Sequence, residues 1–203
     1  MADGYEEQLA PNIYFDRSFN LEAAKILPGE YYVTGRDMVL VTVLGSCVAA
    51  CIRDYHSGIG GMNHFMLPDS AADDNSAMGT SARYGTYAME ILINQLLKLG
   101  ARRINLEAKV FGGGNVLKGL TVANVGQRNA DFVMEYLDTE KIRVVAQDLV
   151  DIYPRKVYYF PSSGKVMVKK LRTLHNNTVF AREKDYGARL QKSKVEGDVE
   201  LFG

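Results

Sequence analysis

The sequence predicts an α/β fold, a sandwich built on an antiparallel or mixed β-sheet with two main helices. Many short runs of β-branched and aromatic residues lie between glycine, proline and other turn residues, as strands do. Two longer segments, residues 82–99 and 129–137, instead carry apolar residues at the three- and four-residue spacing of a helix. Helices and strands do not alternate regularly along the chain, which favours an antiparallel or mixed sheet.

The first part of the chain contains four predicted strands separated by turn residues. They cover residues 26–35, 37–46, 48–53 and 59–67. The last two are joined by "DYHSG", which is typical of a hairpin connection. The polar stretch "PDSAADDNSAMGTS", residues 68–81, is predicted to be a loop, either a functional one or a surface excursion.

The clearest predicted helix covers residues 82–99, with Ser81 as its cap and Gly100 after its end. In the strand "INLEAKV" that follows, every second side chain is expected to be buried; these are Ile104, Leu106, Ala108 and Val110. The second helix should turn an apolar side inward, formed by Phe132, Val133, Tyr136 and Leu137. The remaining predicted strands are residues 142–150, 155–161 and 165–171.

Composition excludes several classes of protein. Lys plus Arg and Asp plus Glu are 24 each in 203 residues, so the net charge is zero and broad nucleic-acid binding is not expected. The acidic start and the lack of any apolar run near 20 residues argue against a signal peptide and membrane insertion. Two cysteines do not form a disulfide framework. We therefore expect a cytoplasmic protein without a cofactor or metal.

The chain length suits one domain with tails. We expect an N-terminal extension at residues 1–26 and a folded domain at residues 27–175. Residues 176–203 are polar and are expected to be a tail or a docking segment.

The stretch "VTVLGSCVAACIRD" raises the question of what Cys47 does. A disulfide to Cys51 along one strand would have to span about 13 Å, whereas linked Cα atoms lie within about 7 Å. A zinc site with His56 and His64 lacks the usual ligand spacing. Burial as an inert thiol is the favoured interpretation for Cys51. Cys47 follows a Gly-Ser pair that could expose it and free its backbone N–H, so a nucleophile remains open beside the inert thiol.

His64 decides how far the nucleophile hypothesis can be taken. In an antiparallel hairpin, the residue numbers of any two opposed residues add up to the same value, which we call the index sum. A sum of 111 places Cys47 opposite His64, a sum of 113 places them diagonally on one face, and an even sum separates them. The alternative for His64 is a hydrogen-bonded core histidine. A third group could orient the imidazole or bind substrate, and the candidates nearby are Thr42, Ser46, Asp54 and Asn63.

Several blocks of the sequence together resemble one protein family. They are "VLGSCVAACIRD", "GIGGMNHFMLP", "RYGTYAMEILINQLLKLGARRINLEAKVFGGGNV", "VGQRNADFVMEYL" and "FPSSGKVMVKKL". In this order they resemble CheD, the chemoreceptor glutamine deamidase family of bacterial chemotaxis, from about Leu27 to Leu171. The chain departs from many members after Asp148, where "LVDIYPRK" replaces a Gly-Gly pair.

The resemblance implies a fold similar to the catalytic domain of cytotoxic necrotizing factor toxins. It also implies a Cys-His-Thr site that converts receptor glutamines to glutamates, with Cys47, His64 and Thr42 in these positions. Gly45, Ser46 and Asn63 are the expected oxyanion and substrate-binding residues. Expected partners are methyl-accepting chemotaxis receptors and a CheC-type phosphatase.

Two other functions remain open at this point. The chain could be a non-catalytic adaptor that binds receptors or the phosphatase, or a cysteine protease with the same residues. The segment "FGGGN" resembles a phosphate-binding loop but lacks the Lys-Ser/Thr ending, so close backbone packing is the favoured interpretation.

Overall fold

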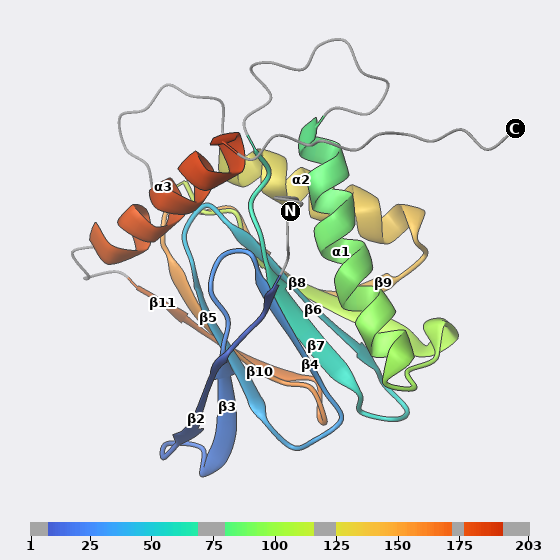
Figure 1. Ribbon diagram of the computed structural model, residues 1–203. Helices are drawn as coiled ribbons and strands as arrows, with labels where there is room; N and C mark the ends of the chain where they lie inside the picture. The colour runs from blue at the N-terminus through green and yellow to red at the C-terminus, as the bar shows by residue number, and fades with distance from the viewer. Residues whose placement is uncertain (1–7, 69–79, 116–124, 172–176, 193–203) are drawn as a thin grey trace, which may run out of the picture.

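A computed structural model describes residues 8–68, 80–115, 125–171 and 177–192 (Figure 1). Two mixed β-sheets pack face to face. The first sheet has six strands in the order β1 (Gln8–Leu9), β4 (Glu30–Thr34), β7 (Gly60–His64), β6 (Val48–Asp54), β8 (Leu106–Gly112) and β9 (Arg143–Leu149). The second has five strands in the order β11 (Lys165–Lys170), β10 (Arg155–Phe160), β5 (Val39–Leu44), β3 (Leu21–Lys25) and β2 (Asn12–Asp16). The predicted α/β sandwich is therefore confirmed.

Three α-helices complete the described part of the fold. Helices α1 (Thr80–Lys98) and α2 (Val125–Thr139) pack against the six-stranded sheet, while α3 (Asn177–Lys192) lies across one end of the sandwich (Figure 1). A short 3₁₀ helix, η1, covers Arg103–Asn105. The core forms where the sheets and helices bury their alternating or periodic apolar side chains, including Leu40, Ile52, Phe65, Leu92 and Val133.

Two local expectations are wrong for identifiable reasons. Ile104 is 81% exposed, because residues 103–105 form a helical turn and β8 begins only at Leu106. Ser81 lies inside α1, and its hydroxyl donates to the carbonyl of Pro68 at 2.6 Å instead of capping the helix. Most of the predicted loop at 68–81, residues 69–79, lies outside the described residues.

The segments expected to lie outside the domain contribute ordered structure. Strands β1, β2 and β3 all lie within residues 1–26, and β3 pairs in parallel with β5 at the centre of the second sheet. Ala23 and Ala24 of β3 are both fully buried, on opposite faces of that sheet: Ala24 lies in the core between the sheets, and Ala23 packs in a smaller cluster with Val39 and Val41. Helix α3 comes from the polar C-terminal segment, and its position determines how the candidate site is covered.

Candidate active site

The loop that carries Cys47 connects the two sheets. Strand β5 ends at Leu44 in the five-stranded sheet, and β6 begins at Val48 in the six-stranded sheet. Gly45, Ser46 and Cys47 therefore cross from one layer of the sandwich to the other at its end. We call these three residues the nucleophile loop.

A glycine turn holds the nucleophile loop from one side. The N–H of Gly113 donates to the carbonyl of Cys47 at 2.8 Å, and the N–H of Gly114 donates to that of Gly45 at 2.7 Å. Gly112 has a φ of +112°, and a Cβ there would lie 2.2 Å from the Cys47 carbonyl oxygen. Only glycine fits this conformation and this close approach. The predicted role of "FGGGN" in close backbone packing is confirmed.

Asn129 of α2 holds the same loop from the other side. Its Nδ2 donates to the carbonyl of Ser46 at 2.9 Å, and its Oδ1 accepts from the N–H of Leu67 at 2.9 Å. Both bonds are fully buried and serve backbone groups that have no strand partner at this point. The sequence pattern predicts Asn129 only as the start of a helix and indicates no role for its side chain.

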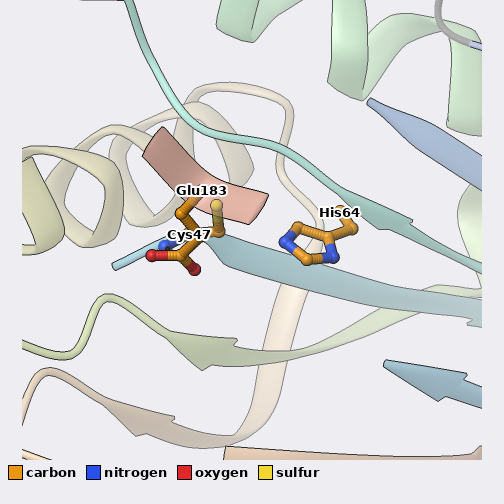
Figure 2. Close-up of side chains that lie close together, drawn as sticks. All are labelled: Cys47, His64 and Glu183. Carbon is orange, nitrogen blue, oxygen red and sulfur yellow. Dashed lines mark hydrogen bonds between the residues drawn. The ribbon is translucent and has the colours of Figure 1, made fainter. Parts of the chain in front are cut away.

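The strand register brings Cys47 and His64 together. Cys51 pairs with Met62, and Val48 forms a bridge to Phe65, so the index sum is 113. Cys47 and His64 are therefore diagonal neighbours on one face of the sheet. This is one of the two registers that place them on the same face. Their reactive atoms, the Cys47 sulfur and a His64 ring nitrogen, lie within 4.8 Å (Figure 2).

Thr42 fixes the orientation and tautomer of the His64 ring. The Thr42 hydroxyl donates to the carbonyl of Ile26 at 2.7 Å, so it can only accept at its 2.8 Å contact with His64 Nδ1. The Nδ1 atom therefore carries the proton of the neutral ring, and Nε2 is a free acceptor. Among the described residues, Nε2 is a buried side-chain atom without a hydrogen-bond partner. This contact joins β5 to β7 across the two sheets.

Glu183 of α3 fills the space in front of the nucleophile loop. Its Oε1 accepts from the N–H groups of Gly45 at 2.7 Å and Cys47 at 3.2 Å. Its Oε2 accepts from the N–H and the hydroxyl of Ser46 at 2.8 and 2.7 Å. The carboxylate is 96% buried and is held by four donors, three of them backbone amides. Figure 2 shows it converging with the other two side chains.

Sequence reasoning missed Glu183 because it lies in a polar segment without a recognisable motif. One signal was present: Glu183, Tyr186 and Leu190 are buried at the three- and four-residue spacing of a helix face, and the residues between them are charged or small. That spacing predicts a docked helix, although it does not say where the helix docks.

Burial and charge control the protonation of the site. Burial, and then the neighbouring Glu183 carboxylate, raise the pKa of the Cys47 thiol well above its ordinary value. Burial also lowers the pKa of His64 to about 4, opposed by the Glu183 charge. Cys47 is therefore a thiol beside a neutral imidazole while Glu183 is in place. The expectation of an accessible Cys47 is corrected, since its exposure is 0%.

Cys47, His64 and Glu183 are also a possible set of metal ligands, since their ligand atoms lie within 4.8 Å of one another. The donor set fits a metal poorly. Each carboxylate oxygen of Glu183 accepts two hydrogen bonds, so its lone pairs are directed at amides and a hydroxyl. Burial and the carboxylate keep the thiol protonated, whereas a metal binds thiolate. The geometry is that of an anion-binding loop.

Other residues considered in the sequence lie elsewhere. The expectation that Asn63 binds substrate is wrong. Asn63 is next to His64 on β7, so the two side chains face opposite sides of the sheet, and that of Asn63 bonds to the backbone of Ala50 and Ala88 under α1. The side chain of Asp54 accepts from the backbone N–H of Arg102 at 2.8 Å, at the far end of β6. Cys47 and Cys51 are both free thiols.

Comparisons with known proteins show which family the chain belongs to. The family described as "CheD chemotactic sensory transduction" matches residues 66–170. A protein of Methylobacillus flagellatus named "Probable chemoreceptor glutamine deamidase CheD" is 68% identical over the full length of both chains. A protein of the same name from Janthinobacterium sp. is 66% identical over all of both chains. The chain belongs to the CheD family.

Membership covers the nucleophile loop and the C-terminal helix as well as the part matched by the family profile, because these relatives align from end to end. Within the described residues of this CheD-family chain, the search for a helix capable of spanning a bilayer found none.

Proposed function

We propose that this chain deamidates selected glutamine side chains of methyl-accepting chemotaxis receptors to glutamate and releases ammonia. The observation that carries the proposal is the buried Cys47–His64–Thr42 chain, which ends in a loop whose amides bind a glutamate carboxylate. A site that holds a glutamate side chain has the shape needed for a glutamine side chain, which differs by one NH₂ group.

The first half of the reaction forms a thioester. His64 Nε2 takes the Cys47 proton as the sulfur attacks the carboxamide carbon of the substrate. The backbone amides of Gly45 and Cys47 then hold the oxyanion, because both now donate to a single oxygen atom, Oε1 of Glu183. The protonated His64 returns the proton to the nitrogen as the C–N bond breaks and ammonia leaves.

The second half hydrolyses the thioester. His64 Nε2 accepts a proton from water, the hydroxide attacks the thioester carbon, and the sulfur leaves and recovers the proton from His64. The glutamic acid that forms loses its proton to solvent and becomes the carboxylate. Thr42 holds the ring through Nδ1 in both halves, so that Nε2 stays directed toward the reacting atoms. The product carries one more negative charge than the substrate.

The proposal includes the finer expectations of fold and setting. A fold similar to the catalytic domain of cytotoxic necrotizing factor toxins, a cytoplasmic location and a CheC-type phosphatase as a partner all follow from the family resemblance. The two mixed sheets and the cysteine–histidine pair across neighbouring strands are consistent with that fold.

Intact-mass analysis of a receptor cytoplasmic fragment tests the proposed function. The wild-type chain should add about one dalton per modified glutamine, the difference between amide and acid. Cys47→Ala should abolish this gain, and Cys51→Ala is the matched control, since Cys51 is equally buried but lies outside the site. Equal activity of the two variants would refute Cys47 as the nucleophile.

An adaptor function is the second candidate, and the complete burial of Cys47 favours it. An adaptor would bind the receptor fragment without changing its mass, and Cys47→Ala would bind as the wild type does. Binding by calorimetry together with the mass measurement separates the two functions.

A further inference from the structure

Glu183 occupies the candidate site, but the proposed mechanism gives it no role. Glu183 belongs to the same chain, yet its carboxylate lies where the proposed product carboxylate would form. It accepts from all three amides of the nucleophile loop and from the Ser46 hydroxyl, so it occupies the donors that a substrate oxygen would need. The Cys47 sulfur has no exposure to solvent while this helix is docked.

The surface against which α3 packs, which we call its seat, resembles a groove that binds a helix. Three α3 side chains are buried in it, Glu183, Tyr186 and Leu190. Tyr186 packs so closely over Gly29 that a Cβ there would lie 2.9 Å from the ring, and its hydroxyl contacts that of Tyr84 on α1. Gly187 lies against Met66, where a side chain would meet the Met66 methyl at 3.1 Å.

Most of α3 stays outside this seat. Ala181, Arg182, Lys184, Asp185, Ala188 and Arg189 are exposed. Cavities of about 300 and 330 Å³ also border the helix, the first reaching Thr42, His64 and Glu183, and the second lying beside Glu30 and Tyr186. Among the described residues of α3, Tyr186 and Leu190 belong to the main hydrophobic core cluster, so the helix can leave while the rest of that core stays packed.

We propose that α3 is an intramolecular product analogue, whose Glu183 occupies the place of the glutamate that deamidation creates, and that α3 must leave its groove before a substrate glutamine can bind. This inference rests on the proposed function, because it identifies the occupied anion site as the site of the reaction. The substrate that fits the vacated groove is a helix that presents one glutamine, with a small residue four positions later where Gly187 meets Met66.

The charge of Glu183 reinforces the block. A carboxylate next to the sulfur opposes formation of the thiolate, and the pKa of Cys47 is raised by it in addition to burial. A neutral carboxamide in the same place would not oppose the thiolate in this way. The docked state therefore excludes substrate and also suppresses the nucleophile.

The rate at which iodoacetamide alkylates Cys47 in the full-length chain tests whether α3 covers the sulfur. Mass spectrometry measures the alkylation at each site separately. Glu183→Ala should increase the rate about tenfold or more, as expected if α3 is docked in over about nine-tenths of the molecules. Tyr186→Ala should do the same without changing the charge at the site. Lys184→Ala, on the exposed side of α3, is the matched control and should react as the wild type does. Unchanged alkylation in both groove variants would overturn the proposal.

Receptor deamidation separates inhibition from catalysis. Glu183→Ala and Tyr186→Ala should raise kcat/KM for a receptor fragment by a similar factor over Lys184→Ala. A folded Glu183→Ala variant as inactive as Cys47→Ala would instead make Glu183 a catalytic residue and contradict the inference. Wild-type turnover of the same fragment reports on the proposed function separately, so the failure of one is distinguishable from the failure of the other.

The variant Glu183→Gln gives a test that needs no receptor. It places a carboxamide in the groove, so attack by the Cys47 sulfur, loss of ammonia with a proton from His64, and hydrolysis of the thioester by water should restore glutamate at position 183. The peptide should be about one dalton heavier than the encoded amide. The double variant Cys47→Ala, Glu183→Gln should keep the amide. An amide that persists at position 183 beside an intact Cys47, in a preparation that deamidates receptor, refutes the product-analogue assignment.

Discussion

At the scale of single residues, the site depends on one hydrogen-bond chain from Ile26 through Thr42 to His64. The carbonyl of Ile26 takes the only hydroxyl proton of Thr42, and this forces Nδ1 of His64 to donate. Nε2 is thereby left unprotonated and without a described partner. Three buried groups thus determine which nitrogen can accept the thiol proton, and a change in any one of them should alter the chemistry without exposing the site.

Thr42→Val should lower kcat for deamidation by roughly 100-fold, the usual contribution of a positioned general base. Valine has nearly the same shape but leaves Nδ1–H unsatisfied, so the ring loses its orientation. Thr42→Ser keeps the hydroxyl and should retain most of the activity. Steady-state ammonia release measures both, and a valine variant as active as the serine variant would show that the bond does not orient the ring.

His64 should make the chain sensitive to acid. Burial holds the pKa of His64 at about 4 in the folded state, below its ordinary value of 6.5. Between these pH values the unfolded chain binds a proton that the folded chain does not. The contribution of neutral His64 to the free energy of unfolding is therefore fully present above pH 6.5 and is lost as the pH is lowered toward 4. From pH 7 to pH 5 the loss should be about 2 kcal/mol.

Denaturant unfolding at pH 7 and pH 5 measures this effect as a difference between the wild type and His64→Gln. The variant cannot take up the proton, so its stability should fall less over the same interval. Identical pH dependence of the two proteins would mean that the His64 imidazole is not kept neutral by folding.

At the scale of the elements, the nucleophile loop has no strand partners of its own and is held by its neighbours. The glycine turn after β8 donates two backbone hydrogen bonds to it, and Asn129 of α2 donates a third. These bonds leave the N–H groups of Gly45, Ser46 and Cys47 free to bind an oxygen atom. The loop is therefore preorganised by β8 and α2.

Asn129→Ala should lower the unfolding free energy by about 3 kcal/mol, since it leaves a buried carbonyl and a buried N–H without partners. The matched control is Asp131→Ala on the same helix, because Asp131 is exposed and its loss should cost less than about 0.5 kcal/mol. Urea denaturation gives both values. Equal stability of the two variants would show that Asn129 does not support the loop.

At the scale of the whole molecule, local patterns predicted most elements but not the way in which they meet. Periodicity and turn residues predict the strands from β4 to β11 and helices α1 and α2, although β8 begins at Leu106 instead of Ile104 and α2 begins at Val125 instead of Asn129. The odd register of β6 and β7 is one of the possibilities that the sequence allows. Asn129 and Glu183 were not found, because their roles depend on contacts 83 and 137 residues away along the chain. Such pairings are set by the packing of layers, which a local pattern does not contain.

A buried charge also joins the two sheets at the end of the sandwich that carries the nucleophile loop. Arg155 of β10 has no exposed side-chain surface, and its guanidinium donates to the carbonyls of Gly112 and Val150 and to the carboxylate of Asp148 at 3.1 Å. All three acceptors lie at the ends of β8 and β9 in the other sheet. A single side chain therefore ties the five-stranded sheet to the glycine turn that holds the nucleophile loop.

Arg155→Met should lower the unfolding free energy by about 1–3 kcal/mol, the usual cost of leaving a buried acceptor without its donor, because the Asp148 carboxylate that remains is partly exposed. Its effect should extend to the site, because Gly112 loses a donor and the loop beside it loses support. Lys170→Met is the control: its ammonium pairs with Asp151 at 2.7 Å at the surface, and such pairs contribute less than about 1 kcal/mol. If thermal and urea unfolding show the arginine variant to be as stable as the lysine variant, the sheets do not depend on this charge, and the nucleophile loop must be held by the glycine turn and Asn129 alone.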